Sequence, residues 1–276
     1  MWKLYDDLLE GIPEDWWAEE IARGCDYAYV RSRNGLGMGE FLPNSWRAPL
    51  SLKNLEGAPL REVAACIKSW NFPEASIGLA AINAYYNNPD VAKAAGVTLS
   101  DSKHVEDRVY DPFIMSQNEV RGKKVTVVGH FPYLETLFEP VCDLRIIAGE
   151  IPLDDDYPAT AAEYLLPESE YVFIRSAALV DKTMPRLLEL SKRAAKVTIV
   201  GPATTLAPVL FRYGAADLSG FVVKDRERAM RLIRGSENGK IFTTGQKVAF
   251  KRQEFQRKPA DLPGTRSAST ATEQRR

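Results

Sequence analysis

The strongest constraint on the fold is a series of short apolar runs in the second half of the chain, several of which end in glycine. Each run has the length and composition of a buried parallel strand. Helical patterns separate several of them, notably over residues 183–195 and 225–234, which predicts right-handed βαβ crossovers and a parallel sheet. The runs are 124–129, 144–148, 171–175, 196–201 and 220–223. We therefore expect an α/β, Rossmann-like domain here.

The first half has a different pattern. Residues 2–10 have helical spacing, and residues 26–33 alternate before an Asn34-Gly35 turn that predicts a hairpin with 36–42. Helices are predicted over 60–70 and 74–86. The hairpin glycines 35, 37 and 39 would let another backbone or a ligand approach closely. These features indicate a smaller α+β domain.

We expect the boundary between the two domains near residue 118. The α+β domain would span 1–118 and the Rossmann-like domain 119–252, with 253–276 as a polar, disordered tail.

Composition narrows the environment and the partners. A formal net charge of −1 argues against nucleic acid and anionic membranes as partners. The three cysteines are widely spaced and odd in number, which favours a reducing compartment. No run is long enough for a membrane helix, and the N-terminus lacks the apolar run of a signal peptide. We expect a cytoplasmic protein that binds a small molecule or metal complex, and the sequence leaves a homo-oligomer open.

The expected ligand site follows from strand geometry, because open parallel sheets bind ligands beyond the C-terminal ends of their strands. That rule selects four loops, which begin at Gly129, Gly149, Ser176 and Gly201. The first loop lacks the G-x-G-x-x-G fingerprint of dinucleotide-binding proteins. From these loops we take as candidate ligand-binding residues Gly129, His130, Phe131, Glu150, Ser176, Gly201, Pro202, Thr204 and Thr205, and we add Asn83 from the predicted helix 74–86.

Each polar candidate has a functional and a structural interpretation. His130 would be a metal ligand or proton carrier, or a loop imidazole bonded to backbone. Glu150, at the end of the second strand, is placed to accept hydrogen bonds from ribose hydroxyls. Thr204 and Thr205 would hold a carboxylate or phosphate, or cap the following helix, which we favour. Asn83, if buried, needs partners from a ligand or from the facing domain.

Several chemistries lose support from missing motifs. The cysteines form no C-x-x-C pair or Cys/His cluster, which argues against a structural zinc site. Nucleophile-elbow, Walker A and H-E-x-x-H motifs are also missing from the sequence. The acidic run 154–156 is typical of a solvated face.

The residues discussed above resemble a known family. The matching stretches are 78–84, 127–132, Glu150 with 156–158, 162–167, 179–183 and 200–202 with its Thr-rich continuation. They are similar to uncharacterised bacterial and archaeal proteins labelled "putative heavy-metal chelation", in which an enolase-N-terminal-like domain precedes a Rossmann-like domain. The resemblance implies an interdomain cleft lined by these loops and by the helix that carries Asn83. Ser176-Ala177-Ala178 and Ala203 depart from the family pattern and remove hydroxyl groups from that cleft.

Three functions follow. The leading one is a small-ligand protein of metal homeostasis that holds a divalent or heavy-metal ion, or a metal complex, through His130 and Glu150, with Asn83 and Thr204 as hydrogen-bonding partners. The alternative is an enzyme that uses a nucleotide-type cofactor such as S-adenosylmethionine or a nicotinamide, with Glu150 on the ribose and His130 as acid or base. The third is a non-catalytic interaction protein. The sequence does not decide whether the protein is an enzyme.

Overall fold

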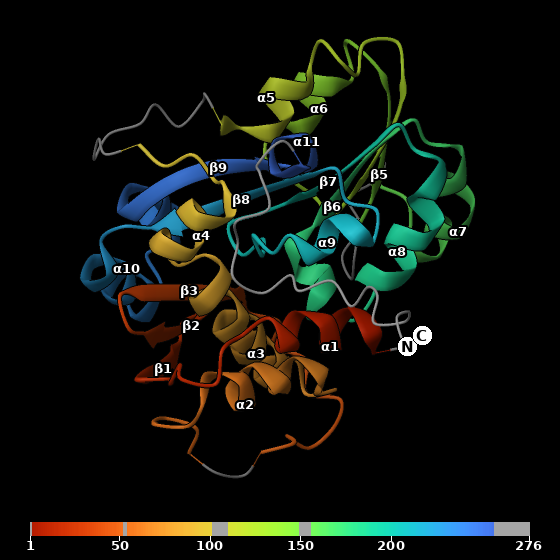
Figure 1. Cartoon of the computed structure of the whole chain (residues 1–276). Helices are drawn as coiled ribbons and strands as arrows, with labels where there is room; N and C mark the ends of the chain where they lie inside the picture. Colours follow the sequence, from red (N-terminus) through yellow and green to blue (C-terminus); the bar gives the residue numbers. More distant parts are fainter. Residues whose placement is uncertain (1, 52–53, 101–109, 149–155, 257–276) are drawn as a thin grey trace, which may run out of the picture.

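The computed structural model describes residues 2–51, 54–100, 110–148 and 156–256. The first half begins with helix α1 (Lys3–Glu10) and a three-stranded antiparallel sheet in the order β1-β2-β3. The hairpin of β2 (Tyr27–Ser32) and β3 (Gly35–Glu40) confirms the turn at Asn34-Gly35, whereas β1 (Glu20–Arg23) was not predicted. Helices α2 (Leu60–Ala65), α3 (Phe72–Tyr86), α4 (Pro89–Ala95) and α5 (Pro112–Ser116) follow (Figure 1).

The glycines of β3 allow the backbone of a helix to pack closely against the strand. A Cβ atom on Gly37 would lie 2.0 Å from the Ala84 nitrogen, and one on Gly39 would lie 2.1 Å from the Ser76 carbonyl oxygen. Both partner atoms belong to α3. Of the two interpretations of these glycines, close approach of another backbone therefore holds, and α3 lies directly on the strand.

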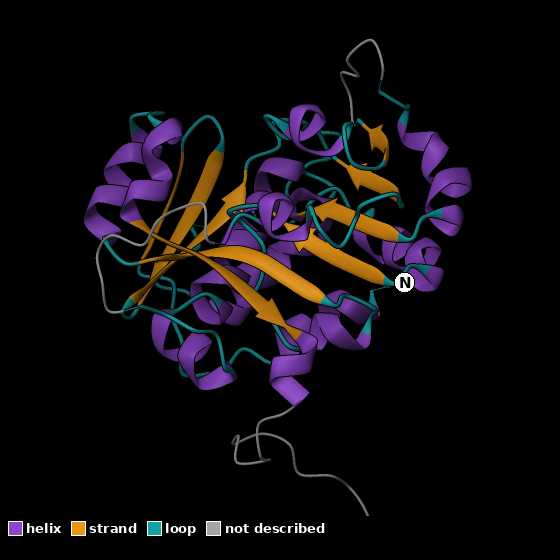
Figure 2. Cartoon of the chain, turned by 90° about the horizontal axis from the view of Figure 1, so that it is seen from above, coloured by secondary structure: helices purple, strands orange, loops and turns teal. Residues whose placement is uncertain are grey.

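The second half forms a six-stranded sheet in the order β5-β4-β6-β7-β8-β9. Strands are drawn in orange and the helices that pack around them in purple in Figure 2. The first five strands of this order are mutually parallel, which confirms the expected α/β, Rossmann-like architecture. They are β4 (Lys124–Val128), β5 (Asp143–Ile147), β6 (Tyr171–Arg175), β7 (Lys196–Val200) and β8 (Asp217–Val223). The last strand, β9 (Gly245–Lys251), is antiparallel to β8 and was not predicted.

The helices of the second half cover both faces of the sheet. They are α6 (Leu134–Phe138), α7 (Ala162–Leu165), α8 (Met184–Leu190), α9 (Val209–Arg212), α10 (Arg226–Arg234) and α11 (Arg252–Gln256). On one face, side chains of α5 and α6 pack against β4, β5 and β6. On the other face, α8 and α9 pack in a hydrophobic cluster that continues into α1, α2 and α3. The apolar core therefore runs through both halves of the chain.

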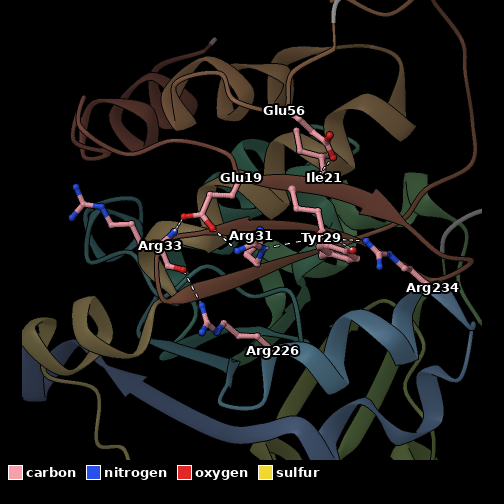
Figure 3. Close-up of polar contacts among 9 residues, drawn as sticks. Glu19, Ile21, Tyr29, Arg31, Arg33, Glu56, Arg226 and Arg234 are labelled. Atoms are coloured by element: carbon pink, nitrogen blue, oxygen red, sulfur yellow. Dashed lines mark hydrogen bonds and ion pairs between the residues drawn. The ribbon is translucent and has the colours of Figure 1, made fainter.

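The small sheet lies between helices from the two halves. Ala28 and Val30 of β2 point into the cluster that contains α3, whereas Tyr29 points into a second cluster with α10. At its two ends α10 also makes polar contacts with this sheet: Arg226 donates to the Arg33 carbonyl oxygen, and Arg234 pairs with Glu20 (Figure 3). This arrangement fixes the first half against the second.

Two further predictions concern the C-terminal tail and membrane-spanning helices. Residues 253–256, which we assigned to a disordered tail, are helical in α11, where Phe255 stacks near Phe211 and Phe250; the rest of that tail lies outside the described residues. Within the described residues, the helices are too short or too polar to cross a lipid bilayer.

Candidate ligand-binding cleft

A cleft of about 350 Å³ lies where the C-terminal ends of β4, β5 and β6 meet the first half of the chain. The strand order reverses between β4 and β6, so this is the topological switch point at which α/β sheets bind ligands. The first half supplies the segment 42–44 and Phe72 at the start of α3. The lining is mostly apolar: Leu42, Pro43, Phe72, Val128, Gly129, Ile147, Ala148, Ala159, Ala162 and Leu187, together with the polar residues Asn44, Arg175, Asp181 and Thr183.

Arg175 is the cationic side chain of this cleft. It ends β6, and its stem lies against Gly129 so closely that a Cβ atom at position 129 would be 2.9 Å from Arg175 Cδ. Its Nη2 atom donates a 3.0 Å hydrogen bond to Asp181 Oδ2. Asp181 in turn accepts hydrogen bonds at Oδ1 from the backbone nitrogen and the hydroxyl of Thr183. The Arg175 side chain is thus held at two points, its stem against Gly129 and its guanidinium on Asp181.

Ionisable groups around this pair have altered proton affinities. Burial raises the pKa of the Glu40 carboxyl at the end of β3, and Asp181 and Asp26 add to that effect while Arg175 opposes it. Burial also lowers the pKa of Lys182 to about 8, against the attraction of Asp181 and Glu74. Lys182 adopts a left-handed backbone (φ 68°) and donates to the Ser69 and Val180 carbonyl oxygens. It thereby ties the 181–183 segment to the first half.

The structure distributes the predicted glycine-loop residues between two cavities. Gly129 lines the cleft. Phe131, Gly201 and Pro202 instead line a smaller cavity of about 110 Å³ beside α5. Ser176 is fully buried between them, with its hydroxyl 2.6 Å from the position that a Cβ on Gly201 would take. The three predicted loops that begin at Gly129, Ser176 and Gly201 therefore meet at one edge of the sheet but do not share one pocket, and the loop that begins at Gly149 lies outside the described residues.

His130 points toward two carboxylates. Its Nε2 atom lies 3.6 Å from Glu135 Oε1 and its Nδ1 atom 3.6 Å from Asp156 Oδ2, and the imidazole is about one-third exposed (35%). Among the described residues, no three His, Cys, Asp or Glu side chains are arranged to hold a metal ion. Glu150, the other predicted metal ligand, and Asp154 and Asp155 lie outside the described residues.

Asn83 has partners from the protein itself. It is fully buried, and its amide nitrogen donates to the carbonyl oxygens of Met38 and Ala203, at 2.7 and 2.8 Å. Its Oδ1 atom accepts a 2.7 Å hydrogen bond from the Thr205 hydroxyl. The second half of the chain, rather than a ligand, thus completes the hydrogen bonds of this side chain.

The capping prediction for the two threonines was wrong. Helix α9 begins at Val209, and its N-cap position is Pro208, which offers no side-chain hydrogen bond. Thr204 and Thr205 lie in a buried loop before that helix. The loop is held by α3, because Asn87 donates to the Thr204 carbonyl oxygen and accepts from the Leu206 nitrogen. Burial against a second element competed successfully with local capping.

Arg175, Asp181 and Thr183 were not among the ligand-binding residues predicted from the sequence. One signal was available, because Arg175 is a charged residue at the end of an otherwise apolar strand whose C-terminal end must face the site. The Asp-x-Thr spacing of Asp181 and Thr183 is typical of a local side-chain-to-backbone turn. No local pattern pairs Arg175 with Asp181, since that contact depends on the turn between them.

Comparisons with known proteins agree with this architecture. The family model described as "Putative heavy-metal chelation" (DUF364) matches residues 111–252, and a second model with the same description (DUF4213) matches residues 5–86. A solved structure of a protein of unknown function from Desulfitobacterium hafniense DCB-2, of the DUF364 family, is 55% identical. It covers 91% of this chain and 98% of its own, with a TM-score of 0.84.

Two more proteins match at lower identity over nearly the same length, one as a solved structure and one by sequence alone. A Pyrococcus horikoshii protein of the DUF364 family, also of unknown function, is 20% identical, with a TM-score of 0.73 and coverage of 90% of this chain and 98% of its own. At this identity the likeness concerns the fold alone. An uncharacterised protein of Methanocaldococcus jannaschii is 24% identical over 254 residues, which are 87% of this chain and 92% of that protein.

Proposed function

Since this chain belongs to the DUF364 family, whose description is "Putative heavy-metal chelation", we propose that it binds a metal ion as a complex with a small organic chelator in the cleft at the ends of β4, β5 and β6. The observation that carries the proposal is the position of this cleft. It lies at the switch point of the sheet, it is closed on one side by the first half, and its volume is in the range of small-molecule sites.

A complex fits the cleft better than a bare ion. Protein sites that hold a transition metal directly need several nitrogen, sulfur or oxygen ligands converging on one point. The described residues contain no such group of three, and the cleft wall is mostly apolar. An apolar wall suits the organic part of a ligand, and the chelator would supply most of the metal's coordination.

His130 is the described side chain that we propose as a protein ligand to the metal. It follows the cleft-lining Gly129, and it is partly exposed. Glu135 and Asp156 each lie 3.6 Å from one ring nitrogen, so one of these carboxylates would orient the ring while the other nitrogen binds the metal. Glu150 remains a proposed second ligand.

The proposal is tested by thermal unfolding of metal-stripped protein. The probes are Ni²⁺, Co²⁺, Zn²⁺ and Cu²⁺, each added as the free ion and as its citrate complex, with citrate alone as a control. A ligand at about 100 times its Kd adds roughly 2.7 kcal/mol, a shift of several degrees in Tm. We expect a citrate complex to stabilise the protein more than either component. Equal stabilisation by the free ion, or by citrate alone, would contradict the proposal.

A pair of variants tests the role of His130. His130→Ala should reduce the amount of metal retained with the protein, measured by elemental analysis after gel filtration. His104→Ala, which changes the other histidine of the chain, is the matched control. Equal metal retention by the parent and His130→Ala would remove His130 from the site without affecting the position proposed for the chelator.

A further inference from the structure

Arg175 lines the cleft and has unused hydrogen-bonding capacity among the described residues. A guanidinium carries five N–H donors, arranged along two edges that each present a parallel pair. The protein contact described for Arg175 is the hydrogen bond from Nη2 to Asp181; among the described residues, Nε and Nη1 have no partner. Nη2 belongs to both edges and has two hydrogens. Whichever hydrogen Asp181 accepts, the other edge keeps two parallel donors.

This side chain is also held in place before any ligand arrives. Gly129 has a left-handed backbone (φ 106°), and the Arg175 stem fills the space where a side chain at 129 would stand. Asp181 fixes the far end, and Thr183 fixes Asp181. Preorganisation of this kind lowers the entropy that binding must offset.

From this geometry we infer that the ligand of the cleft carries a carboxylate, which the free edge of the Arg175 guanidinium receives as a bidentate pair, and an apolar body that contacts the wall around Phe72 and Leu187. The inference rests on the proposed function in one respect, namely that the cleft binds a small organic ligand. It adds the chemical class of that ligand and the residue that recognises it.

A carboxylate fits better than a phosphate. Asp181 already offsets the single positive charge of Arg175, and Glu40 at the end of β3 is a second acidic group near the pair. A phosphate dianion would bring a second negative charge close to both acidic groups, which is less favourable than the single charge of a carboxylate. Phosphate sites also use the backbone N–H groups of a helix N-terminus or a glycine-rich nest. Here the cleft-lining glycine loop after β4 is occupied by the stem of Arg175.

The test uses pairs of ligands that differ only in charge. Hexanoate and phenylacetate are compared with hexanamide and phenylacetamide, and phenyl phosphate is the third class. Binding to the full-length protein is measured by ligand-observed NMR titration. We expect each acid to bind more tightly than its amide, and phenylacetate to bind more tightly than phenyl phosphate. An amide that binds as well as its acid, or a phosphate that binds more tightly, would overturn the inference.

Variants assign the effect to Arg175. Arg175→Met should weaken phenylacetate binding roughly ten- to a hundredfold, the range for a hydrogen-bonded charged group, with little change for the amide. Arg175→Lys keeps the charge but loses the paired N–H donors of the guanidinium, so its affinity for phenylacetate should lie between those of the parent and Arg175→Met. It also replaces Arg175→Met in the test if that variant does not fold. Arg186→Met is the control, because Arg186 pairs with Glu163 and Glu189 and is not among the residues that line the cleft. Unchanged acid binding in the Arg175 variants would overturn the inference.

The two proposals fail separately. If the acids bind through Arg175 while no metal–citrate complex stabilises the protein, the ligand class stands and the metal is excluded. If a metal complex binds equally well to the parent and to both Arg175 variants, the proposed function stands and the role of Arg175 falls.

Discussion

The hydroxyl of Thr205 donates a 2.7 Å hydrogen bond to Oδ1 of Asn83, which lies in the last turn of α3 and 122 positions away in the sequence. Both residues are fully buried. The same asparagine donates to carbonyl oxygens on β3 and on the loop after β7. One amide therefore connects the small sheet, the helix that covers it and the Rossmann-like half, in a place where water cannot replace a lost partner.

Asn83→Ala should lower the free energy of unfolding by about 3 kcal/mol, because it leaves two buried carbonyl oxygens and a hydroxyl without their partner. Thr205→Val removes one of these hydrogen bonds and should cost about 1 kcal/mol. Urea denaturation measures both, with Asn54→Ala at an exposed position as the control. The double variant should cost less than the sum of the two single changes, since the residues share a bond. Strict additivity would show that they do not interact.

The contact between β3 and α3 makes a second prediction. Gly37→Ala would place a methyl group 2.0 Å from the Ala84 nitrogen and 2.1 Å from the Ala80 carbonyl oxygen. The helix must then move away from the sheet, and we expect a loss of about 3 kcal/mol or more in the free energy of unfolding. Gly239→Ala is the control, because nothing lies within 4 Å of its Cβ position. Similar stability of the two variants would contradict the close packing.

From the lowered pKa of Lys182 we expect the free energy of unfolding to depend on pH in the alkaline range. Burial lowers the pKa of this amine to about 8, whereas the unfolded chain keeps the ordinary value of 10.5. Below about pH 8 both states hold the proton, so the contribution is constant. Between pH 8 and 10.5 the unfolded state binds the proton that the folded state has lost, so the contribution to stability rises with pH.

The comparison with Lys182→Met isolates this effect, because tyrosines and cysteines also titrate in the alkaline range. The free energy of unfolding of the parent minus that of the variant should be flat up to about pH 8 and then increase toward pH 10.5. Urea denaturation at a series of pH values measures it. A difference that stays constant over the whole range would mean that Lys182 keeps an ordinary pKa.

The cysteines should differ strongly in reactivity, because the thiolate is the reacting form. Burial, with Glu74 nearby, raises the pKa of Cys66 to about 12, and burial raises the pKa of Cys142 to about 11. Cys25 is exposed. With a colorimetric thiol reagent at about pH 8, native protein should release the equivalent of one thiol quickly, and Cys25→Ser should abolish that phase. Fast labelling that survives Cys25→Ser would show that a buried thiol is accessible.

Much of the fold follows from patterns of neighbouring residues. A strand buried on both faces is mostly apolar, so β4, β6 and β7 are visible as short apolar runs, with Thr126 and Thr198 as buried polar exceptions. The hairpin of β2 and β3 is visible because the Asn34-Gly35 turn suits tight connections. The edge strand β9 also had a signal in the sequence, since Val248 and Phe250 alternate with Lys247, Ala249 and Lys251, but no strand was predicted there.

The loops were placed correctly as a group, because parallel strands bring their C-terminal ends to one edge of the sheet. Their individual roles were not predictable. Thr205 bonds Asn83 instead of capping a helix, and Gly129 accommodates the stem of Arg175 while it lines the cleft. Each outcome depends on a partner distant in sequence or on the path of a turn.

The sequence by itself determined the α/β class, the switch-point location of the expected site and the hairpin with closely approached glycines, since these follow from periodicity and from short-range backbone preferences. Only the tertiary structure decided that α10 and α3 enclose the small sheet, that Asn83 is satisfied within the protein and that Arg175, in the lining of the apolar cleft, keeps donors with no partner among the described residues. Such outcomes depend on which buried polar groups find hydrogen-bond partners across the fold. These partners are distant in sequence, so patterns of neighbouring residues do not predict them.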